Sequence, residues 1–231
     1  METKEIVRVI NEQKDFILVD KPPGINFHDE DEPGSGLFSQ IKNILNLAEL
    51  YPVHRLDKLT SGLILFAKNK DTAQDFQRLF SEHKVEKYYL AISDKKPKKK
   101  QGLVKGDMAK SRRGMWKLLR TQNNPAISQF FSYALGDGKR LFLVKPHSGK
   151  THQIRVALNS LGAPIIGDST YYPGSNADRG YLHAYAIGFQ LNQARYQYIL
   201  KPDCGDLFVD TGTVNRLKEI PPPWELNWPK V

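Results

Sequence analysis

Hydrophobic residues occur along this chain in short runs that stop at charged or turn-forming residues. Phe16–Val19, Leu63–Ala67 and Tyr88–Ile92 each contain four or five consecutive apolar or aromatic residues. Runs of this length that end at a turn signal such as Lys21-Pro22-Pro23-Gly24 are typical of buried strands. The pattern therefore predicts three strands in the interior of a sheet.

Two further pairs of segments predict antiparallel strands. Phe130–Tyr133 and Leu141–Val144 flank Gly136-Asp137-Gly138, and these glycines supply the backbone freedom that a hairpin turn requires. Leu182–Ala184 and the alternating stretch Arg195–Ile199 also have strand-like sequences. Strands that follow one another through such short turns favour antiparallel pairing.

Apolar residues at helical spacing predict two helices. Asp71–Phe80 carries one such stripe. Thr151 is placed as the N-cap of the second helix, which ends at Gly162 and has the apolar face Ile154, Ala157, Leu158 and Leu161. Because strands outnumber helices, we expect an α+β fold with a mixed, largely antiparallel sheet core rather than a doubly wound parallel fold.

The length and composition of the chain indicate the size of the domain and the charge of its partner. The chain has 231 residues, of which 40% are hydrophobic, enough for one large domain or two small subdomains around a shared core. Its formal net charge is +9 and its isoelectric point is about 9.4. This charge favours a polyanionic partner, most simply a nucleic acid, although many basic enzymes bind none.

The cellular location follows from what the sequence lacks. Cys204 is the single cysteine, so it has no internal disulfide partner and suits a reducing cytoplasm, where it serves as a small apolar filler. The first residues, Met1–Glu5, are charged, and no apolar run approaches the ~18 residues of a membrane span. We expect a cytoplasmic protein without a membrane anchor.

Asp57 stands out as a candidate reactive group. It lies between the cations Arg55 and Lys58, just before Thr60-Ser61-Gly62 and a buried strand, and a loop held by a rigid strand can present a reactive side chain. A guanidinium opposite the carboxylate, such as that of Arg155, would keep it ionised and orient it as a nucleophile. The simpler alternative is that Asp57 only caps the turn.

A second stretch, Gly149-Lys150-Thr151-His152-Gln153-Ile154-Arg155, follows His54-Arg55-Leu56-Asp57 about ninety residues later. Together the two stretches closely resemble the RluA family of pseudouridine synthases. The resemblance runs in family order from about residue 14 to about residue 190. The remaining matching segments are Lys21-Pro22-Pro23-Gly24, Lys87-Tyr88-Tyr89-Leu90-Ala91, Gly167-Asp168-Ser169-Thr170-Tyr171 and Leu182-His183-Ala184.

The resemblance implies a role for individual residues. Asp57 corresponds to the catalytic aspartate, Arg155 to its salt-bridge partner and Tyr89 to the active-site aromatic. Arg55 corresponds to the residue that fills the space left by the extruded base. We expect the other RNA contacts at His54, Lys150 and His152, with His54 and Thr60 also shaping the loop. Tyr88 should point to the opposite face of its strand and lie in the core.

The implied fold and reaction suit these residues. The family fold has two α+β subdomains flanking a central cleft. Conversion of uridine to pseudouridine breaks the glycosidic bond to N1, turns the base, rejoins it through C5 and removes the C5 proton, which requires neither cofactor nor metal. The carboxylate can attack the sugar, attack the base or stabilise the cationic sugar. A stacked uridine must first be flipped out, at a cost of a few kcal/mol, which a stacking Arg55 would partly offset.

The chain also departs from the family pattern. Lys150 stands where Arg is usual and Ala157 where His is frequent, which affects RNA affinity more than catalysis. We expect residues 1–13 to form a short extension, with no small N-terminal RNA-binding domain of the S4 type, and residues 14–231 to form the catalytic domain. A basic insertion at about residues 95–120 would contact RNA through Lys98, Lys99, Arg112 and Arg113, or be an ordinary solvated loop and hairpin.

The partner is therefore RNA, either ribosomal RNA, transfer RNA or both, and we expect a monomer. Two alternatives compete with the enzyme. One is a catalytically inactive RNA-binding or ribosome-assembly factor, which would not need Asp57, Tyr89 and Arg155 together. The other is a metal-dependent hydrolase, although the spacing of its candidate ligands fits no standard metal signature. Those ligands would be His54, Asp57, His147 and His152.

Overall fold

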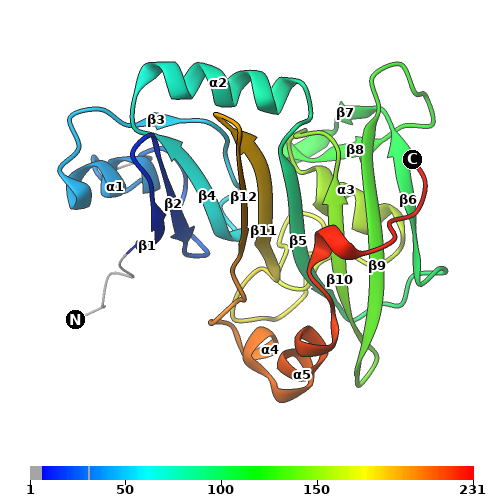
Figure 1. The fold of residues 1–231 in the computed structure, drawn as a ribbon. Coiled ribbons are helices and arrows are strands. Elements are labelled where there is room, and N and C mark those ends of the chain that lie inside the picture. The colour runs from blue at the N-terminus through cyan, green and yellow to red at the C-terminus, as the bar shows by residue number, and fades with distance from the viewer. Residues whose placement is uncertain (1–6, 31) are drawn as a thin grey trace.

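A large twisted sheet organises the protein, and helices cover both of its faces (Figure 1). The structure, a computed structural model, describes residues 7–30 and 32–231. The ten-stranded sheet has the order β1-β2-β4-β11-β5-β10-β9-β6, with β3 paired to β4 and β12 paired to β11. A separate two-stranded hairpin consists of β7 and β8. Blue and cyan segments lie on one side of β11 and β5, and green segments lie on the other (Figure 1).

The bounds of the elements are as follows. The strands of the large sheet are β1 (Arg8–Glu12), β2 (Phe16–Lys21), β3 (Tyr51–Pro52), β4 (Ser61–Ala67), β5 (Glu86–Ser93), β6 (Gln101–Gly106), β9 (Ala126–Gly136), β10 (Lys139–Pro146), β11 (Leu182–Leu191) and β12 (Ala194–Ile199). The hairpin strands are β7 (Met108–Lys110) and β8 (Trp116–Leu118). The α-helices are α1 (Leu37–Leu45), α2 (Lys70–Ser81), α3 (Gln153–Ser160), α4 (Asp206–Val209) and α5 (Thr211–Glu219), and single 3-10 turns cover Arg112–Gly114 and Pro223–Glu225.

The predicted fold class is confirmed. Among the described residues, every strand pair is antiparallel except β4 with β11, so the sheet is mixed and largely antiparallel. The predicted hairpin is present, since β9 pairs with β10 and Lys139 lies opposite Gly136. The parallel pair joins the N-terminal part of the sheet to β11, which comes more than a hundred residues later in the chain.

Apolar side chains bury both faces of the sheet. On one face, Phe16 of β2 packs edge-on against Phe76 of α2, with ring centroids 5.9 Å apart. On the other face, Ile17 and Ile64 pack with Ile41 of α1. Neighbouring residues of β2 therefore serve different cores, as the alternation of side chains along a strand requires. Helix α1 lies outside the predicted helices, although its buried residues Leu37 and Ile41 are four positions apart.

The prediction that Thr151 caps the second helix is wrong. Helix α3 begins at Gln153, and His152 at its N-cap has the left-handed backbone φ of 57° and makes no capping bond through its side chain. Instead, the Gln153 side-chain oxygen accepts from the Ser148 hydroxyl (2.7 Å) and from the Lys150 N–H (3.1 Å), which stabilises the turn before the helix.

The structure describes part of the expected N-terminal extension and the whole of the basic segment. Residues 1–6 of the expected extension lie outside the described residues, and Arg8–Glu12 forms β1, which pairs with β2 at the edge of the sheet. In the basic segment, Lys95–Lys100 is an exposed connection to β6 apart from the buried Pro97, and Met108–Leu118 includes the β7–β8 hairpin. None of the helices in the described residues has the length and apolar character to cross a bilayer.

Candidate active site

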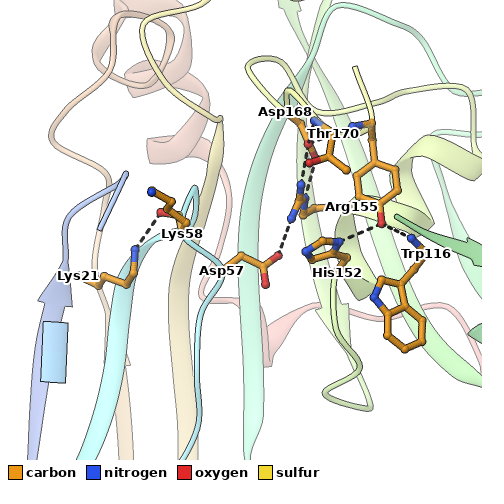
Figure 2. A network of polar contacts seen from close by, with 9 residues as sticks. Lys21, Asp57, Lys58, Trp116, His152, Arg155, Asp168 and Thr170 are labelled. Atoms are coloured by element: carbon orange, nitrogen blue, oxygen red, sulfur yellow. Dashed lines mark hydrogen bonds and ion pairs between the residues drawn. The ribbon is translucent and has the colours of Figure 1, made fainter. Parts of the chain in front are cut away.

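Asp57 lies in the loop between β3 and β4, and the loop is held by a buried lysine. The ammonium of Lys21 donates to the backbone carbonyls of Lys58 (3.1 Å) and Thr60 (2.8 Å), as well as to that of Pro22 (3.0 Å). Figure 2 shows Lys21 reaching toward the loop from the adjacent strand. Burial lowers the pKa of Lys21 to about 7, and this desolvation is offset by the three carbonyl oxygens. The lysine fixes the path of the chain on the C-terminal side of Asp57.

A close backbone contact explains why the Thr60-Ser61-Gly62 turn ends in a glycine. Gly62 has φ of +102° inside β4, where it pairs in parallel with Ala184 of β11. A Cβ at this position would lie 2.4 Å from the Ala184 carbonyl oxygen, so only glycine permits this close approach. The same contact ties the Asp57 loop to the middle of the large sheet.

Arg155 bridges two carboxylates. Its Nη1 lies 3.2 Å from Oδ2 of Asp57, while its Nε and Nη2 donate to both carboxylate oxygens of Asp168 at 2.7 and 2.8 Å. The side chains of Arg155 and Asp168 are 5% and 0% exposed, whereas that of Asp57 is 28% exposed. The fork with Asp168 therefore immobilises the guanidinium and leaves one nitrogen to orient a carboxylate that solvent and substrate can reach.

Among the described contacts, the side chain of Asp57 does not cap the turn. Its backbone carbonyl accepts the Thr60 N–H at 3.0 Å, and its side chain is turned toward Arg155 (Figure 2). Burial disfavours the charged guanidinium of Arg155, but Asp168 and then Asp57 outweigh this effect and raise the pKa of Arg155. The pair is thus a permanent cation facing a carboxylate.

A second layer of contacts surrounds Arg155. The guanidinium lies 5.0 Å from the ring centroid of Tyr171, and the Tyr171 hydroxyl lies 3.0 Å from Nδ1 of His152. The same hydroxyl accepts the backbone N–H of Trp116 at 2.8 Å, which connects the β7–β8 hairpin to the site (Figure 2). Burial, followed by the charge of Arg155, lowers the pKa of His152. His152 is therefore neutral at physiological pH.

Tyr89 and Tyr88 lie on opposite faces of β5, as predicted. Tyr88 is fully buried and packs against Trp224 and Trp228 near the C-terminus. Tyr89 faces the pocket that contains Asp57. Burial, and secondly the charge of Asp57, raises the pKa of Tyr89 above its usual value. Its phenol therefore keeps its proton at neutral pH.

Seven of the predicted site residues line one pocket of about 810 Å³, which is large enough for a nucleoside. They are His54, Arg55, Asp57, Tyr89, Lys150, His152 and Arg155. Within the described part of the chain, the pocket lining does not include Lys98, Lys99, Arg112 or Arg113. Lys98 and Lys99 are exposed in the connection before β6, and the two arginines are exposed at the tip of the β7–β8 hairpin.

His54 makes a structural contact inside this pocket. Its Nε2 accepts the backbone N–H of Leu65 at 3.0 Å, and its ring lies 5.1 Å from that of Phe80. Burial and the nearby charge of Lys87 lower the pKa of His54 to about 3. The acceptor nitrogen must be unprotonated for the Leu65 bond to form, so the geometry and the lowered pKa agree. Both indicate that His54 shapes the loop.

We expect the stability of the protein to fall on acidification because of His54. Its folded pKa is lowered, so between about pH 6.5 and pH 3 the unfolded chain binds a proton that the folded chain excludes. Chemical denaturation at pH 7 and pH 5 measures the loss. His54→Gln, which keeps an acceptor but does not titrate, should reduce that loss by roughly 1 to 2 kcal/mol. An equal loss in wild type and His54→Gln would contradict the assignment.

Two residues of the site carried no predicted role. Lys21 and Asp168 belong to segments of the family resemblance, but their functions depend on partners distant in the chain. A charged residue inside or next to an apolar run is the signal that identifies both. Lys21 ends a run of buried residues in β2, and Asp168 follows Ile165 and Ile166 and is itself fully buried. Buried charges of this kind require partners.

The candidate ligands of a metal-dependent hydrolase are not gathered into a metal site. Across residues 7–30 and 32–231, no three His, Cys, Asp or Glu side chains are grouped so that they could hold a metal ion. His54 accepts from the Leu65 amide, and His147 shares a hydrogen bond with Gln129 at 2.6 Å. One ring nitrogen of each of these two histidines is thus engaged within the protein.

Comparisons with known structures agree with the fold. The structure superposes on "Human RNA Pseudouridylate Synthase Domain Containing 1" with a TM-score of 0.72, covering 88% of this chain and 86% of that one at 24% identity. For "Human RNA Pseudouridylate Synthase Domain Containing 4" the TM-score is 0.71, with 91% and 93% covered at 24% identity. At this level of identity, the similarity establishes the fold.

Comparisons of sequence establish the family. The family model described as "RNA pseudouridylate synthase" matches residues 15–160. An "Uncharacterized RNA pseudouridine synthase" of Haemophilus influenzae is 50% identical over 186 residues, which cover 79% of this chain and 82% of the relative. The "Ribosomal large subunit pseudouridine synthase C" of Rickettsia bellii is 34% identical over 168 residues, and the match covers 71% of this chain and 56% of that protein. As its resemblance to the RluA members predicted, the chain belongs to the RNA pseudouridylate synthase family, whose members are isomerases.

Proposed function

We propose that this protein converts specific uridines in structured RNA to pseudouridine and that Asp57 is its catalytic residue. The observation that carries the proposal is the Asp57–Arg155–Asp168 arrangement. It presents one partly exposed carboxylate, oriented by a guanidinium that a buried carboxylate holds in place. Such an ionised, aimed carboxylate acts on a glycosidic bond either as a nucleophile or by stabilising the positive charge that develops on the sugar.

Tyr89 has a more limited part in this chemistry. Its ring offers a flat surface for uracil in the same pocket as Asp57. Since burial raises the pKa of its phenol, Tyr89 is a hydrogen-bond donor rather than the base that removes the C5 proton. We assign the acceptance of this proton to the Asp57 carboxylate, which lies in the same pocket.

We propose ribosomal RNA, transfer RNA or both as the substrate, and a cytoplasmic monomer as the form of the protein that acts on it. The Rickettsia bellii relative is named for the large ribosomal subunit. Large-subunit ribosomal RNA is therefore the first substrate to test. The exposed Lys98, Lys99, Arg112 and Arg113 lie outside the pocket and would contact RNA flanking the target, while Lys150 and His152 lie beside it.

The test of this function uses ribosomal and transfer RNA that lack pseudouridine. Incubation with the purified protein should produce pseudouridine at one or a few positions, and the same positions should lose the modification in a strain deleted for the gene. RNA that binds but gains no pseudouridine would support the alternative, a catalytically inactive RNA-binding or ribosome-assembly factor. Mapping the modified positions also identifies the substrate.

Arg55 should matter for the flipped complex rather than for chemistry. Its side chain is exposed, belongs to the same loop as Asp57 and lines the pocket. We expect Arg55→Ala to weaken productive RNA binding by roughly tenfold, since one stacking contact contributes about 1 to 3 kcal/mol. Single-turnover assays over a range of enzyme concentrations separate binding from the rate at saturation. Unchanged affinity and rate would refute this role.

A further inference from the structure

Lys87 lies beside Tyr89 in the pocket. The two residues are two positions apart on β5, so their side chains share one face of the strand at a separation of about 6.6 Å. Both line the pocket that contains Asp57. The Lys87 ammonium also lies 5.5 Å from the ring centroid of Phe80, another residue of the pocket wall. The catalytic pocket therefore contains a cation next to the surface proposed for the base.

This ammonium has no anionic partner among the residues that the structure describes. Lys87 makes no ion pair and no side-chain hydrogen bond there, and burial lowers its pKa to about 8. The titratable groups that sense its charge are His54 and His147, and neither is negative. By contrast, Lys145 on β10 pairs with Glu86 at 2.8 Å. A half-buried cation without a counter-charge costs free energy that an anion from outside the chain would offset.

The turn at Gly149 faces the same cation. A Cβ built on Gly149 would lie 3.8 Å from Nζ of Lys87, so the absence of a side chain leaves space next to the ammonium. In the described structure, the backbone N–H groups of Gly149 and Thr151 donate to no protein acceptor. The turn is rigid, because Gln153 accepts from Ser148 and Lys150 on either side of Gly149. An ammonium and free amides in a glycine turn suit phosphate oxygens.

We propose that Lys87 and the Gly149 turn form a subsite for a phosphodiester of the RNA backbone, adjacent to the uridine that Tyr89 receives. The subsite rests on the proposed function, because the location of the uracil follows from it. With a uracil on Tyr89, the nearest anion of the substrate is the phosphate of that nucleotide or of its neighbour. Lys87 thereby holds the backbone while the base is out of the stack.

The first test measures the binding of a single-stranded oligouridylate over a range of salt concentrations. We expect Lys87→Met to weaken binding roughly tenfold and to reduce the slope of log K against log salt by about 0.7, the value for one phosphate contact on a single strand. The matched control is Lys84→Met, which removes the same charge from an exposed lysine paired with Glu82. An unchanged slope in Lys87→Met, or no binding by the wild type, would overturn the proposal.

The second test fills the space at Gly149. The new Cβ of Gly149→Ala would make an ordinary contact with Lys87 Nζ, and the backbone φ there needs no glycine, so the variant should fold normally. We expect it to lose affinity for the oligouridylate as Lys87→Met does, because the methyl group occupies the place of the phosphate. Normal affinity in a folded Gly149→Ala would show that no phosphate lies there.

A third measurement separates phosphate from base. The pKa of Lys87, followed by NMR, should rise when uridine monophosphate binds and should stay at about 8 with uridine. An equal rise with uridine would mean that the ammonium contacts a uracil carbonyl, and the subsite would be wrong. The two proposals fail separately. If the protein forms no pseudouridine but Lys87→Met still weakens RNA binding as expected, the proposed enzymatic function is wrong. If the enzyme is active and Lys87→Met binds RNA normally, the phosphate subsite is wrong.

Discussion

Asp57→Asn should abolish pseudouridine formation while the protein still folds and binds RNA. The substitution keeps the size of the side chain and its hydrogen bond to Arg155 Nη1, but it removes the negative charge 3.2 Å from that nitrogen. Loss of a catalytic nucleophile or charge of this kind reduces turnover by on the order of 10⁴-fold or more. Single-turnover formation of pseudouridine in the mapped RNA, measured beside RNA affinity, gives the result.

The control for this variant is Asp137→Asn. Asp137 is 92% exposed in the β9–β10 turn and has a backbone φ of 47°, which asparagine also adopts. Asp137→Asn changes the net charge of the protein by the same amount as Asp57→Asn. It should therefore reproduce any general effect of charge on RNA binding without an effect on turnover. Retained turnover in Asp57→Asn would overturn the catalytic assignment. Equal losses in both variants would attribute the effect to charge alone.

Arg155→Ala should affect both stability and activity. Removing the guanidinium leaves the fully buried Asp168 without its two hydrogen bonds from Arg155, so among the described residues only the backbone N–H groups of Thr170 and Tyr171 still donate to its carboxylate, and leaves Asp57 without its orienting partner. Breaking a buried ion pair from one side costs about 3 to 5 kcal/mol. We expect the free energy of unfolding to fall by that amount and isomerisation to be lost. Urea denaturation and the pseudouridine assay measure the two effects.

Arg155→Lys separates the two consequences. An ammonium keeps the positive charge, but it has no planar fork with which to hold Asp168 at two oxygens and Asp57 at once. We expect a smaller loss of stability than in Arg155→Ala, with isomerisation still reduced by at least about 10²-fold through misplacement of the carboxylate. An active Arg155→Lys enzyme would show that charge at this position suffices. A stable and active Arg155→Ala would remove Arg155 from the site altogether.

Much of the fold could be predicted because its signals are local. The run Phe16–Val19 lies within β2, and the two glycines of Gly136-Asp137-Gly138 lie at the predicted β9–β10 turn. The start of helix α3 was predicted wrongly because side-chain contacts of Gln153, one of them to a distant strand, determine it. Threonine is a residue type that often caps helices, but here the Gln153 side-chain oxygen accepts the hydrogen bonds of the turn before the helix. The side-chain amide of Gln153 donates to the Ile127 carbonyl of β9 at 3.0 Å.

The candidate site could be predicted only in part. Asp57, Tyr89 and Arg155 were identified through the family resemblance, and composition alone would have made Tyr89 a core aromatic. The roles of Lys21 and Asp168 could not be predicted, because a charged residue beside apolar neighbours reveals that it needs a partner without revealing which one. Lys98 and Lys99, which the charge pattern favoured, lie outside the pocket because the connection that carries them leads to the edge strand β6.

The amino-acid order therefore specified the central strands, two of the helices and the loop that carries Asp57, because side-chain periodicity and turn chemistry act over a few residues, and its motifs indicated the family. The folded chain alone decided what surrounds Asp57. Arg155 is 98 residues away in sequence, and it reaches Asp57 because the parallel β4–β11 pair and the antiparallel β11–β5 pair bring the two halves of the sheet together. The same packing leaves Lys87 beside Tyr89 with no anion among the residues that the structure describes, and this is the feature from which we infer a phosphate subsite.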